Sequence, residues 1–210
     1  SQNYGGIENL SLIPGNVGTS PIQNIGAYGV EVKDTITIVE GIEIATGKLV
    51  TFSNEDCKFG YRNSIFKNTH KGKILLTSVG FKLTKKNHKL NTSYGAIETE
   101  LISKKITTPS LKNISDAVIS IRKTKLPDPK EIGNSGSFFK NPVIAIHHFS
   151  QLKKEYPSIP SYPISDTEIK IPAGWLVEKI GFKGKRFGDA GVHNKQALVL
   201  VNFGNASGVE

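Results

Sequence analysis

The chain has 210 residues, 37% of them hydrophobic and 21% charged, which is enough for one large domain or two small ones with a hydrophobic core. Its 27 Lys and Arg outnumber its 18 Asp and Glu and give a formal net charge of +9. This surplus favours anionic partners such as phosphorylated cofactors or nucleotide-sugars. No basic stretch is interleaved with aromatic residues as in a nucleic-acid-binding motif, so we expect no nucleic-acid partner.

The single cysteine, Cys57, excludes an internal disulfide and suits a reducing compartment. No apolar run is long enough to span a membrane, and no signal peptide opens the chain. We therefore expect a soluble, cytoplasmic protein without a membrane partner. Because residue 1 is not methionine and the closing residues resemble the start of a helix, we also expect an internal fragment of a longer protein.

The first half of the chain is predicted to consist mainly of strands. Residues 12–29, LIPGNVGTSPIQNIGAYG, contain four glycines, two prolines and no charged residue, which predicts an irregular segment that exposes its backbone. Residues 31–40 alternate with β-branched side chains and predict a strand. Residues 42–52 predict a hairpin that turns at 46–47, and residues 73–83 predict a further strand.

A helix is predicted from about Pro109 to Lys125, with Thr108 as its cap and Pro109 in its first turn. Proline cannot continue the hydrogen-bond ladder, so LPDP at 126–129 ends this helix and marks the expected domain boundary. Four apolar residues share one face of it at helical spacing: Leu111, Ile114, Val118 and Ile121.

The second half is predicted to be α+β. Residues 133–142, GNSGSFFKNP, have the composition of a loop. Helices are expected near 147–156 and at 173–181, the second closed by glycine. A Pro- and Tyr-rich loop is expected at 156–166, and QALVLVN at 196–202 predicts a buried strand.

The standard catalytic motifs are absent. The elbow pattern around Ser135 places Ser137 where a glycine is required, and neither a P-loop nor a dinucleotide glycine fingerprint follows a strand. The histidines lack ligand spacing, so we expect no metal. Residue patterns alone leave ordinary structural explanations open for Ser137, Lys125, Arg62 and Tyr162: a loop hydroxyl, a helix-end cation, a salt-bridge partner and loop packing.

Taken together, several segments resemble one family, the UDP-N-acetylenolpyruvoylglucosamine reductases (MurB). The similarity runs in order from about Gly6 to Glu210, and YPSIPSYP resembles the form with a mobile tyrosine loop. The segments are ENLSLIPGNVGTSPIQNIGAYGVE, CKFGYRNSIFK, RKTKLPDP, GNSGSFFKNP and KQALVLVN.

The resemblance implies an α+β fold with a truncated FAD-binding region of the vanillyl-alcohol-oxidase type. Residues 1–126 would form the second part of that region, its N-terminal part being absent. Residues 127–204 would form a small α+β substrate-binding domain, and 205–210 the start of a truncated C-terminal segment. The family's catalytic glutamate would lie outside this chain, so we expect the fragment to be inactive alone.

The resemblance implies a monomeric enzyme of peptidoglycan synthesis that uses FAD and NADPH to reduce enolpyruvyl-UDP-N-acetylglucosamine to UDP-N-acetylmuramate. Arg62 would bind the substrate carboxylate, and Ser137 would donate the proton. The implied flavin contacts are Ile13, Pro14, Gly15, Gln23, Asn24, Gly26, Ala27 and Tyr28. The implied UDP-sugar contacts are Tyr94, Lys125, Asn141, Tyr162 and Gln196.

Two alternatives stay open at this point. One is a catalytically silent module that binds a UDP-sugar without flavin chemistry. The other is a related flavin oxidase acting on another small substrate, which would leave Lys125, Asn141 and Tyr162 without a nucleotide to contact.

Overall fold

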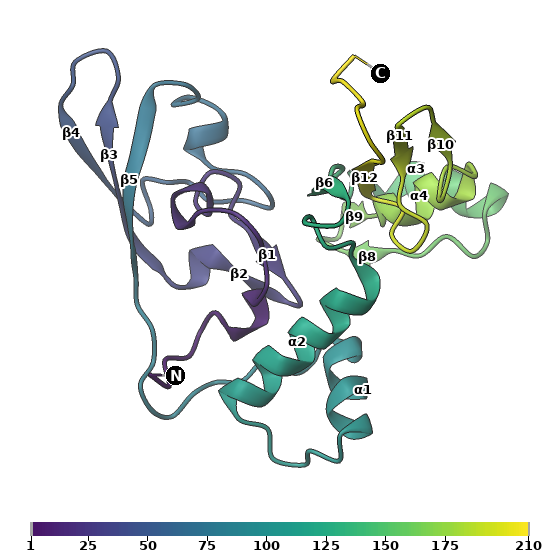
Figure 1. The fold of residues 1–210 in the computed structure, drawn as a ribbon, viewed down its shortest axis with the longest axis horizontal. Coiled ribbons are helices and arrows are strands. Elements are labelled where there is room, and N and C mark those ends of the chain that lie inside the picture. Colours follow the sequence, from purple (N-terminus) through teal and green to yellow (C-terminus); the bar gives the residue numbers. More distant parts are fainter. Residues whose placement is uncertain (1, 210) are drawn as a thin grey trace. The chain divides into compact units, whose positions relative to one another are not determined.

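The computed structural model describes residues 2–209 and divides into two compact units, Ser1–Arg122 and Lys123–Glu210. The division falls inside helix α2 (Leu111–Lys125). Figure 1 shows the elements of each unit along the chain. The functional domain limits expected from the sequence, 1–126, 127–204 and 205–210, stay a prediction.

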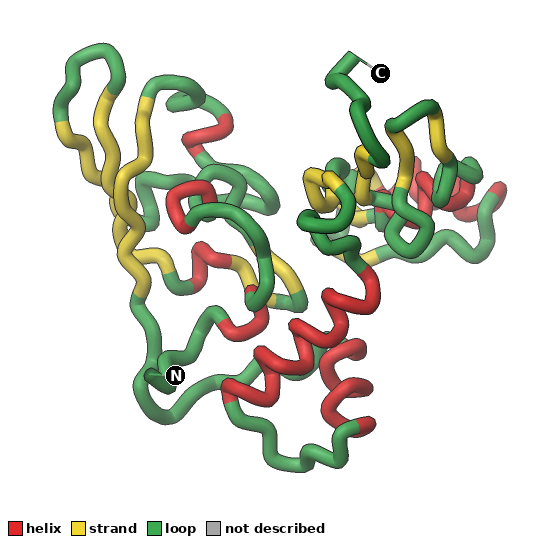
Figure 2. The backbone as a smooth tube through the Cα atoms, in the orientation of Figure 1, coloured by secondary structure: helices red, strands yellow, loops and turns green. Residues whose placement is uncertain are grey.

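The first unit is organised around a three-stranded antiparallel sheet in the order β4-β3-β5 (Figure 2). Its strands are β3 (Ile36–Glu43), β4 (Leu49–Ser53) and β5 (Ile74–Phe81). The predicted hairpin is confirmed, because Gly47 has φ +69° and its amide donates to the Glu43 carbonyl at 2.8 Å. The strand predicted at 73–83 is confirmed as β5.

The strand predicted over 31–40 is wrong in its first part. Val32–Asp34 form a 3₁₀ turn whose N-terminal end is capped by the carboxylates of Glu31 and Asp34, so the strand begins only at Ile36. Local side-chain hydrogen bonds here outweigh the β preference of the sequence. Residues 12–29 are irregular as predicted, apart from a 3₁₀ turn at Val17–Thr19 and strand β1 (Gly26–Ala27), which pairs with β2 (Val30–Glu31).

Helix α2 packs against α1 (Gly95–Ser103), a helix that the sequence patterns did not predict, and the two share a core with Tyr28 at its margin. The predicted apolar face of α2 is confirmed. The predicted cap is wrong, because the hydroxyl of Ser110 accepts from the amide of Asn113 and the helix begins at Leu111. The buried residues of this core are Ile97, Leu101, Ile114, Ala117, Val118 and Ile121.

A second core in this unit is formed by residues of strand β3 and of the neighbouring loops, and it contains Cys57. Cys57 is completely buried, and this burial raises the pKa of its thiol to about 11. The thiol therefore stays protonated at neutral pH and packs as an apolar group. The buried residues of this core are Val32, Ile36, Val39, Cys57, Ile65 and Phe66.

The second unit contains a four-stranded antiparallel sheet in the order β10-β11-β12-β6. The loop predicted at 133–142 is partly wrong, because Gly133–Ser137 form the edge strand β6, paired with β12 (Val199–Asn202). Glycine and polar residues carry no strand signal, so only pairing with the apolar β12 reveals this strand. The remaining two strands are β10 (Arg186–Phe187) and β11 (Ala190–Val192).

A small sheet in the order β7-β9-β8 completes the second unit, with two predicted helices confirmed as α3 (Ile146–Glu155) and α4 (Ala173–Lys179). Gly181 closes α4 with φ +73°. The core here is formed by Phe149, Ile159, Ile169 and Ile171. The strands are β7 (Val143–Ala145), β8 (Tyr162–Pro163) and β9 (Glu168–Lys170).

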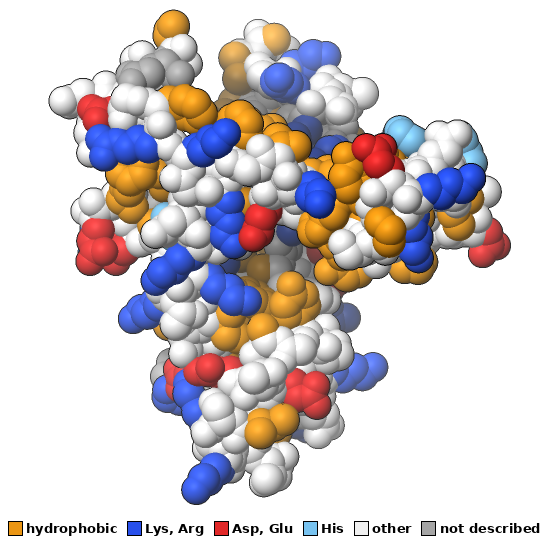
Figure 3. All heavy atoms as spheres, turned by 90° about the vertical axis from the view of Figure 1, so that its right-hand side faces the viewer, with side chains coloured by type: hydrophobic (Ala, Val, Ile, Leu, Met, Phe, Trp, Pro, Cys, Tyr) orange, Lys and Arg blue, Asp and Glu red, His pale blue; other side chains and the backbone are white. Residues whose placement is uncertain are grey.

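Across residues 2–209, no helix combines the length and the apolar character that a membrane span requires. Within the same range, His, Cys, Asp and Glu side chains form no group of three or more that could hold a metal ion. Figure 3 shows Lys and Arg side chains scattered among acidic, polar and hydrophobic ones over the face that it presents.

The two isoleucines Ile114 and Ile102 provide a matched test of the helical core. Ile114 is completely buried, whereas Ile102 on α1 is 68% exposed. We expect Ile114→Ala to lower the free energy of unfolding by about 2–5 kcal/mol, because it leaves a cavity, and Ile102→Ala to lower it by less than about 1 kcal/mol. Urea unfolding followed by circular dichroism measures both. Equal losses for the two variants would contradict this assignment of the core.

Candidate functional site

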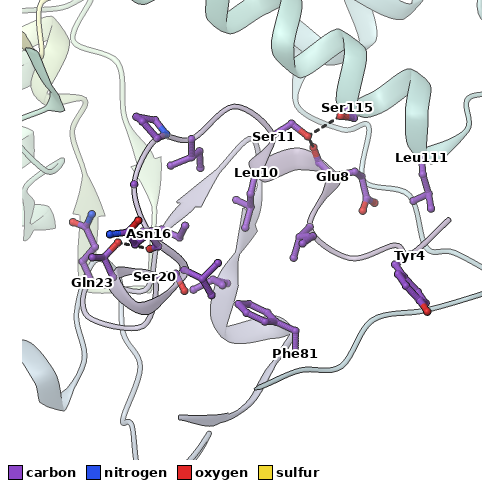
Figure 4. Close-up of a pocket in the computed structure, with 18 of the residues that line it drawn as sticks. Tyr4, Glu8, Leu10, Ser11, Asn16, Ser20, Gln23, Phe81, Leu111 and Ser115 are labelled. Carbon is purple, nitrogen blue, oxygen red and sulfur yellow. Dashed lines mark hydrogen bonds between the residues drawn. The ribbon is translucent and has the colours of Figure 1, made fainter. Parts of the chain in front are cut away.

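A cavity of about 640 Å³ lies in the first unit beside the start of segment 12–29 (Figure 4). Its walls come from the N-terminal turns, from Phe81 of β5 and from the first turns of α2. Four of the eight expected flavin contacts line it: Ile13, Pro14, Gly15 and Gln23. The other four, Asn24, Gly26, Ala27 and Tyr28, lie farther along the segment, outside this lining.

The cavity combines apolar walls with a few polar groups. Ser20 is 5% exposed, and its hydroxyl has no hydrogen-bond partner among the described residues. Ser11 contacts Ser115 of α2 through their hydroxyls at 2.8 Å, as Figure 4 shows. A ligand with an apolar face and a hydrogen-bonding edge suits such a lining, because the buried Ser20 hydroxyl would gain a partner.

Asn24 holds the later part of the segment in place. Its side chain is completely buried, with Nδ2 donating to Gly60 O at 3.0 Å and to Glu31 Oε2 at 3.1 Å. Its Oδ1 accepts from the amide of Lys33 at 3.0 Å. Since the carboxamide is already bonded inside the protein, Asn24 shapes the backbone of the segment, and its expected contact with flavin stays a prediction.

Arg62 points at the same stretch of backbone. Its guanidinium donates to the Gly26 carbonyl, to the Asn24 carbonyl at 3.5 Å and to Glu31 Oε1 at 3.4 Å. The structure thus brings Arg62 together with two of the expected flavin contacts. A substrate carboxylate would have to compete with Glu31 for this guanidinium, and the expected carboxylate-binding role stays a prediction.

Tyr94, an expected substrate contact, lies against Tyr28, an expected flavin contact. Their rings meet edge to face with centroids 5.3 Å apart. Burial raises the pKa of the Tyr28 phenol, and the nearby Arg122 partly offsets this shift. Arg122 and Ser20 lie within segments that carry the family resemblance, but the sequence analysis assigned a role to neither.

In the second unit, two expected substrate contacts gather at the start of α4. Asn141 Oδ1 accepts from the amide of Ala173 at 2.9 Å. The Gln196 side chain lies close to Gly174, the next residue of that helix, with its Oε1 3.9 Å from where a Cβ on Gly174 would be. The polar side chains of Asn141 and Gln196 therefore border the same short stretch of backbone.

The remaining expected residues lie on exposed edges of this unit. Ser137 ends β6 and is followed by Phe138 and Phe139, whose rings meet edge to face at 5.0 Å and are 61% and 49% exposed. Tyr162 in β8 pairs with Lys170 of β9, and the Lys170 ammonium lies 6.0 Å from the centre of its ring. Lys125 is the last residue of α2.

Comparison with known proteins accounts for nearly the whole chain. Over 208 residues it is 62% identical to the UDP-N-acetylenolpyruvoylglucosamine reductase of Flavobacterium johnsoniae. This match covers 99% of this chain and 62% of that protein. The chain is a MurB homologue. Against the reductase of Chromobacterium violaceum it is 49% identical over 209 residues, covering 61% of that protein. The chain thus spans about three fifths of the length of these relatives.

Two further matches agree with this family. Residues 128–210 match the family model described as UDP-N-acetylenolpyruvoylglucosamine reductase, C-terminal domain. The crystal structure of MurB from Thermus caldophilus superimposes with a TM-score of 0.62 at 24% identity, covering 97% of this chain and 56% of that one. The expected α+β fold of the family is therefore confirmed.

Gly26 lets the Arg62 guanidinium and the Val30 backbone approach the segment closely, and a substitution tests whether this close approach matters for stability. A Cβ there would lie 2.9 Å from Arg62 Nη1 and 2.8 Å from the Val30 carbonyl, so the backbone would have to shift. We expect Gly26→Ala to lower the free energy of unfolding by about 1–3 kcal/mol. Gly95→Ala is the control, since nothing lies within 4 Å of its Cβ position. Thermal melting measures both variants, and equal melting temperatures would show that the close approach at Gly26 is unimportant.

Proposed function

We propose that this chain supplies the flavin-ring segment and the UDP-sugar contacts of a UDP-N-acetylenolpyruvoylglucosamine reductase. The reaction is the NADPH-dependent reduction of enolpyruvyl-UDP-N-acetylglucosamine to UDP-N-acetylmuramate, for peptidoglycan synthesis, by a monomer in the cytoplasm. The observation that carries the proposal is the cavity beside Ile13, Pro14 and Gln23, within a chain 62% identical to a reductase over 208 residues.

The cavity fits the ring of FAD in size and chemistry. Its volume of about 640 Å³ lies within the range of roughly 300–1,000 Å³ typical of small-molecule sites. Ile13, Pro14 and Phe81 offer apolar atoms to the face of a flat ring, and the unpartnered hydroxyl of Ser20 suits a polar atom at its edge. When bound, the flavin would supply hydride transfer from NADPH to the substrate.

Two residues of the chain would stabilise the negative charge that develops on the substrate and donate a proton to it. Reduction of an enolpyruvyl ether drives negative charge toward the substrate carboxylate, and a fixed guanidinium stabilises such charge, a role that we assign to Arg62. The carbon next to the reduced one must then gain a proton, which we assign to the hydroxyl of Ser137. A serine hydroxyl is a weak acid, so this step needs a polar network around it.

The UDP end of the substrate needs hydrogen-bond donors and cations. Asn141 and Gln196, beside the start of α4, offer amide groups for a nucleotide base or ribose. Tyr162 and Lys125 would contact the diphosphate, and Tyr94 the sugar side. Tyr162 is 53% exposed on the two-residue strand β8, so it is accessible to a ligand.

We further propose that residues 1–210 by themselves have no turnover. They span 62% of the length of the Flavobacterium johnsoniae reductase. By the family resemblance, the contacts to the FAD diphosphate and the catalytic glutamate would lie outside these residues. Flavin binding by residues 1–210 would then depend on the ring contacts alone, and proton transfer would lack a partner.

Ser137→Ala tests the proposed reaction in a full-length reductase that carries these residues. We expect flavin reduction by NADPH to be unchanged and flavin reoxidation by the enolpyruvyl substrate to slow by about 10²–10⁴-fold, because a positioned acid is lost. Stopped-flow absorbance measures both half-reactions. Ser135→Ala, in the same strand β6, is the control and should reoxidise at the wild-type rate. Reoxidation of Ser137→Ala at that same rate would remove Ser137 from the role.

A further inference from the structure

One side chain of α2 contacts both ends of segment 12–29. The Arg122 Nε donates to the carbonyl oxygen of Leu12 at 3.3 Å. The same guanidinium lies beside the phenol of Tyr28, where it lowers the pKa that burial raises. Leu12 and Tyr28 lie sixteen positions apart in sequence, so Arg122 closes the segment into a loop of defined width.

Both residues held by Arg122 have an unfavourable backbone conformation. Leu12 has φ +61° and Tyr28 has φ +51°, in the left-handed region that residues with a Cβ rarely adopt. The Leu12 side chain is 50% exposed, so burial does little to hold it there. Such strain persists only where surrounding contacts impose it, and it concentrates at functional sites. The bond from Arg122 to the Leu12 carbonyl is such a contact.

Tyr28 is held from three directions. Its carbonyl accepts from Nδ2 of the buried Asn9 at 2.9 Å, and the same nitrogen donates to Asn91 O at 3.0 Å. Its hydroxyl lies beside the guanidinium of Arg122, and its ring packs on Tyr94. Arg122 is therefore the contact that fixes the far end of the ring, next to an expected substrate contact.

The charge of Arg122 is unusual in its surroundings. The side chain is about half buried, and among the ion pairs of residues 2–209 none joins it to a carboxylate. Its polar neighbours are the Leu12 carbonyl and the Tyr28 phenol, both neutral. A helix anchor alone would not require a charged group in this position, since a neutral donor could serve the same two groups at a lower cost of desolvation.

We propose that Arg122 is a positioning residue that clamps both ends of segment 12–29, and that this clamp keeps the segment in the shape that receives the flavin ring. The effect on the flavin site rests on the proposed function, whereas the clamp itself concerns only this chain. The planar fork of the guanidinium suits the task, because its several N–H groups in fixed directions can face two polar groups at once.

The clamp itself can be tested without flavin. In the 210-residue chain labelled with ¹³Cζ-tyrosine, NMR titration follows each phenol, and Tyr28→Phe assigns the Tyr28 signal. We expect the pKa of Tyr28 to rise in Arg122→Met, because the cation that lowers it is gone and burial remains. Lys123→Met, an exposed neighbouring cation, should leave it unchanged. An unchanged Tyr28 pKa in folded Arg122→Met would overturn the clamp.

The link to flavin needs a second measurement, in a full-length reductase carrying these residues. We expect Arg122→Met to weaken FAD binding to the apo-protein about 10–150-fold, the range for a lost hydrogen bond to a charged group, with Lys123→Met at the wild-type value. Arg122→Lys keeps the positive charge, so it serves as a second variant in case Arg122→Met does not fold. It should hold the Tyr28 pKa near the wild-type value yet still weaken FAD binding, because an ammonium lacks the fork.

The outcomes separate the two claims. If wild-type protein binds no FAD, the proposed function fails, while the tyrosine titration still decides whether Arg122 clamps Tyr28. If FAD binds wild type and Arg122→Met equally well although the Tyr28 pKa has risen, the clamp exists but does not shape the flavin site, and the proposal is overturned.

Discussion

The first unit depends on hydrogen bonds that reach segment 12–29 from outside it. The segment has no regular structure over most of its length, so most of its backbone groups need hydrogen-bond partners from outside a helix or sheet ladder. The Asn24 carboxamide bonds to three neighbours, and Arg62 donates to two carbonyls of the segment. Ser64 donates from its hydroxyl to the Ile22 carbonyl at 2.6 Å. Buried, satisfied polar networks of this kind specify one backbone conformation.

This arrangement explains why the segment is rich in glycine and polar groups. A flat ring can approach a backbone closely only where side chains do not intervene, as at Gly15, which has φ +112°. The hydrogen bonds of Asn24, Arg62 and Ser64 favour one conformation of the segment, which reduces the ordering that binding would have to impose. In the second unit, β6 and α4 similarly place Ser137, Asn141 and Gln196 on regular elements or beside them, which holds the expected substrate contacts with little freedom.

Periodic features were predictable from sequence, and long-range contacts were not. The apolar face of α2 and the alternation of β5 identified those elements. Strand β6 was missed because Gly133–Ser137 has no apolar residue, and its pairing partner lies over sixty residues away in sequence. The resemblance named the expected site residues, but not Arg122, whose contacts with Leu12 and Tyr28 span 110 and 94 positions. Such contacts leave no spacing pattern for sequence reasoning to detect.

The central claim is that this cavity serves a flavin that reduces an enolpyruvyl-UDP-sugar. The most direct measurement is the visible absorbance of a full-length reductase carrying these residues, followed without oxygen. The account predicts a yellow protein that NADPH bleaches and that enolpyruvyl-UDP-N-acetylglucosamine then returns to yellow, with one substrate consumed per flavin. A colourless protein, or a bleached one that only oxygen restores, would contradict it, the second result indicating an oxidase.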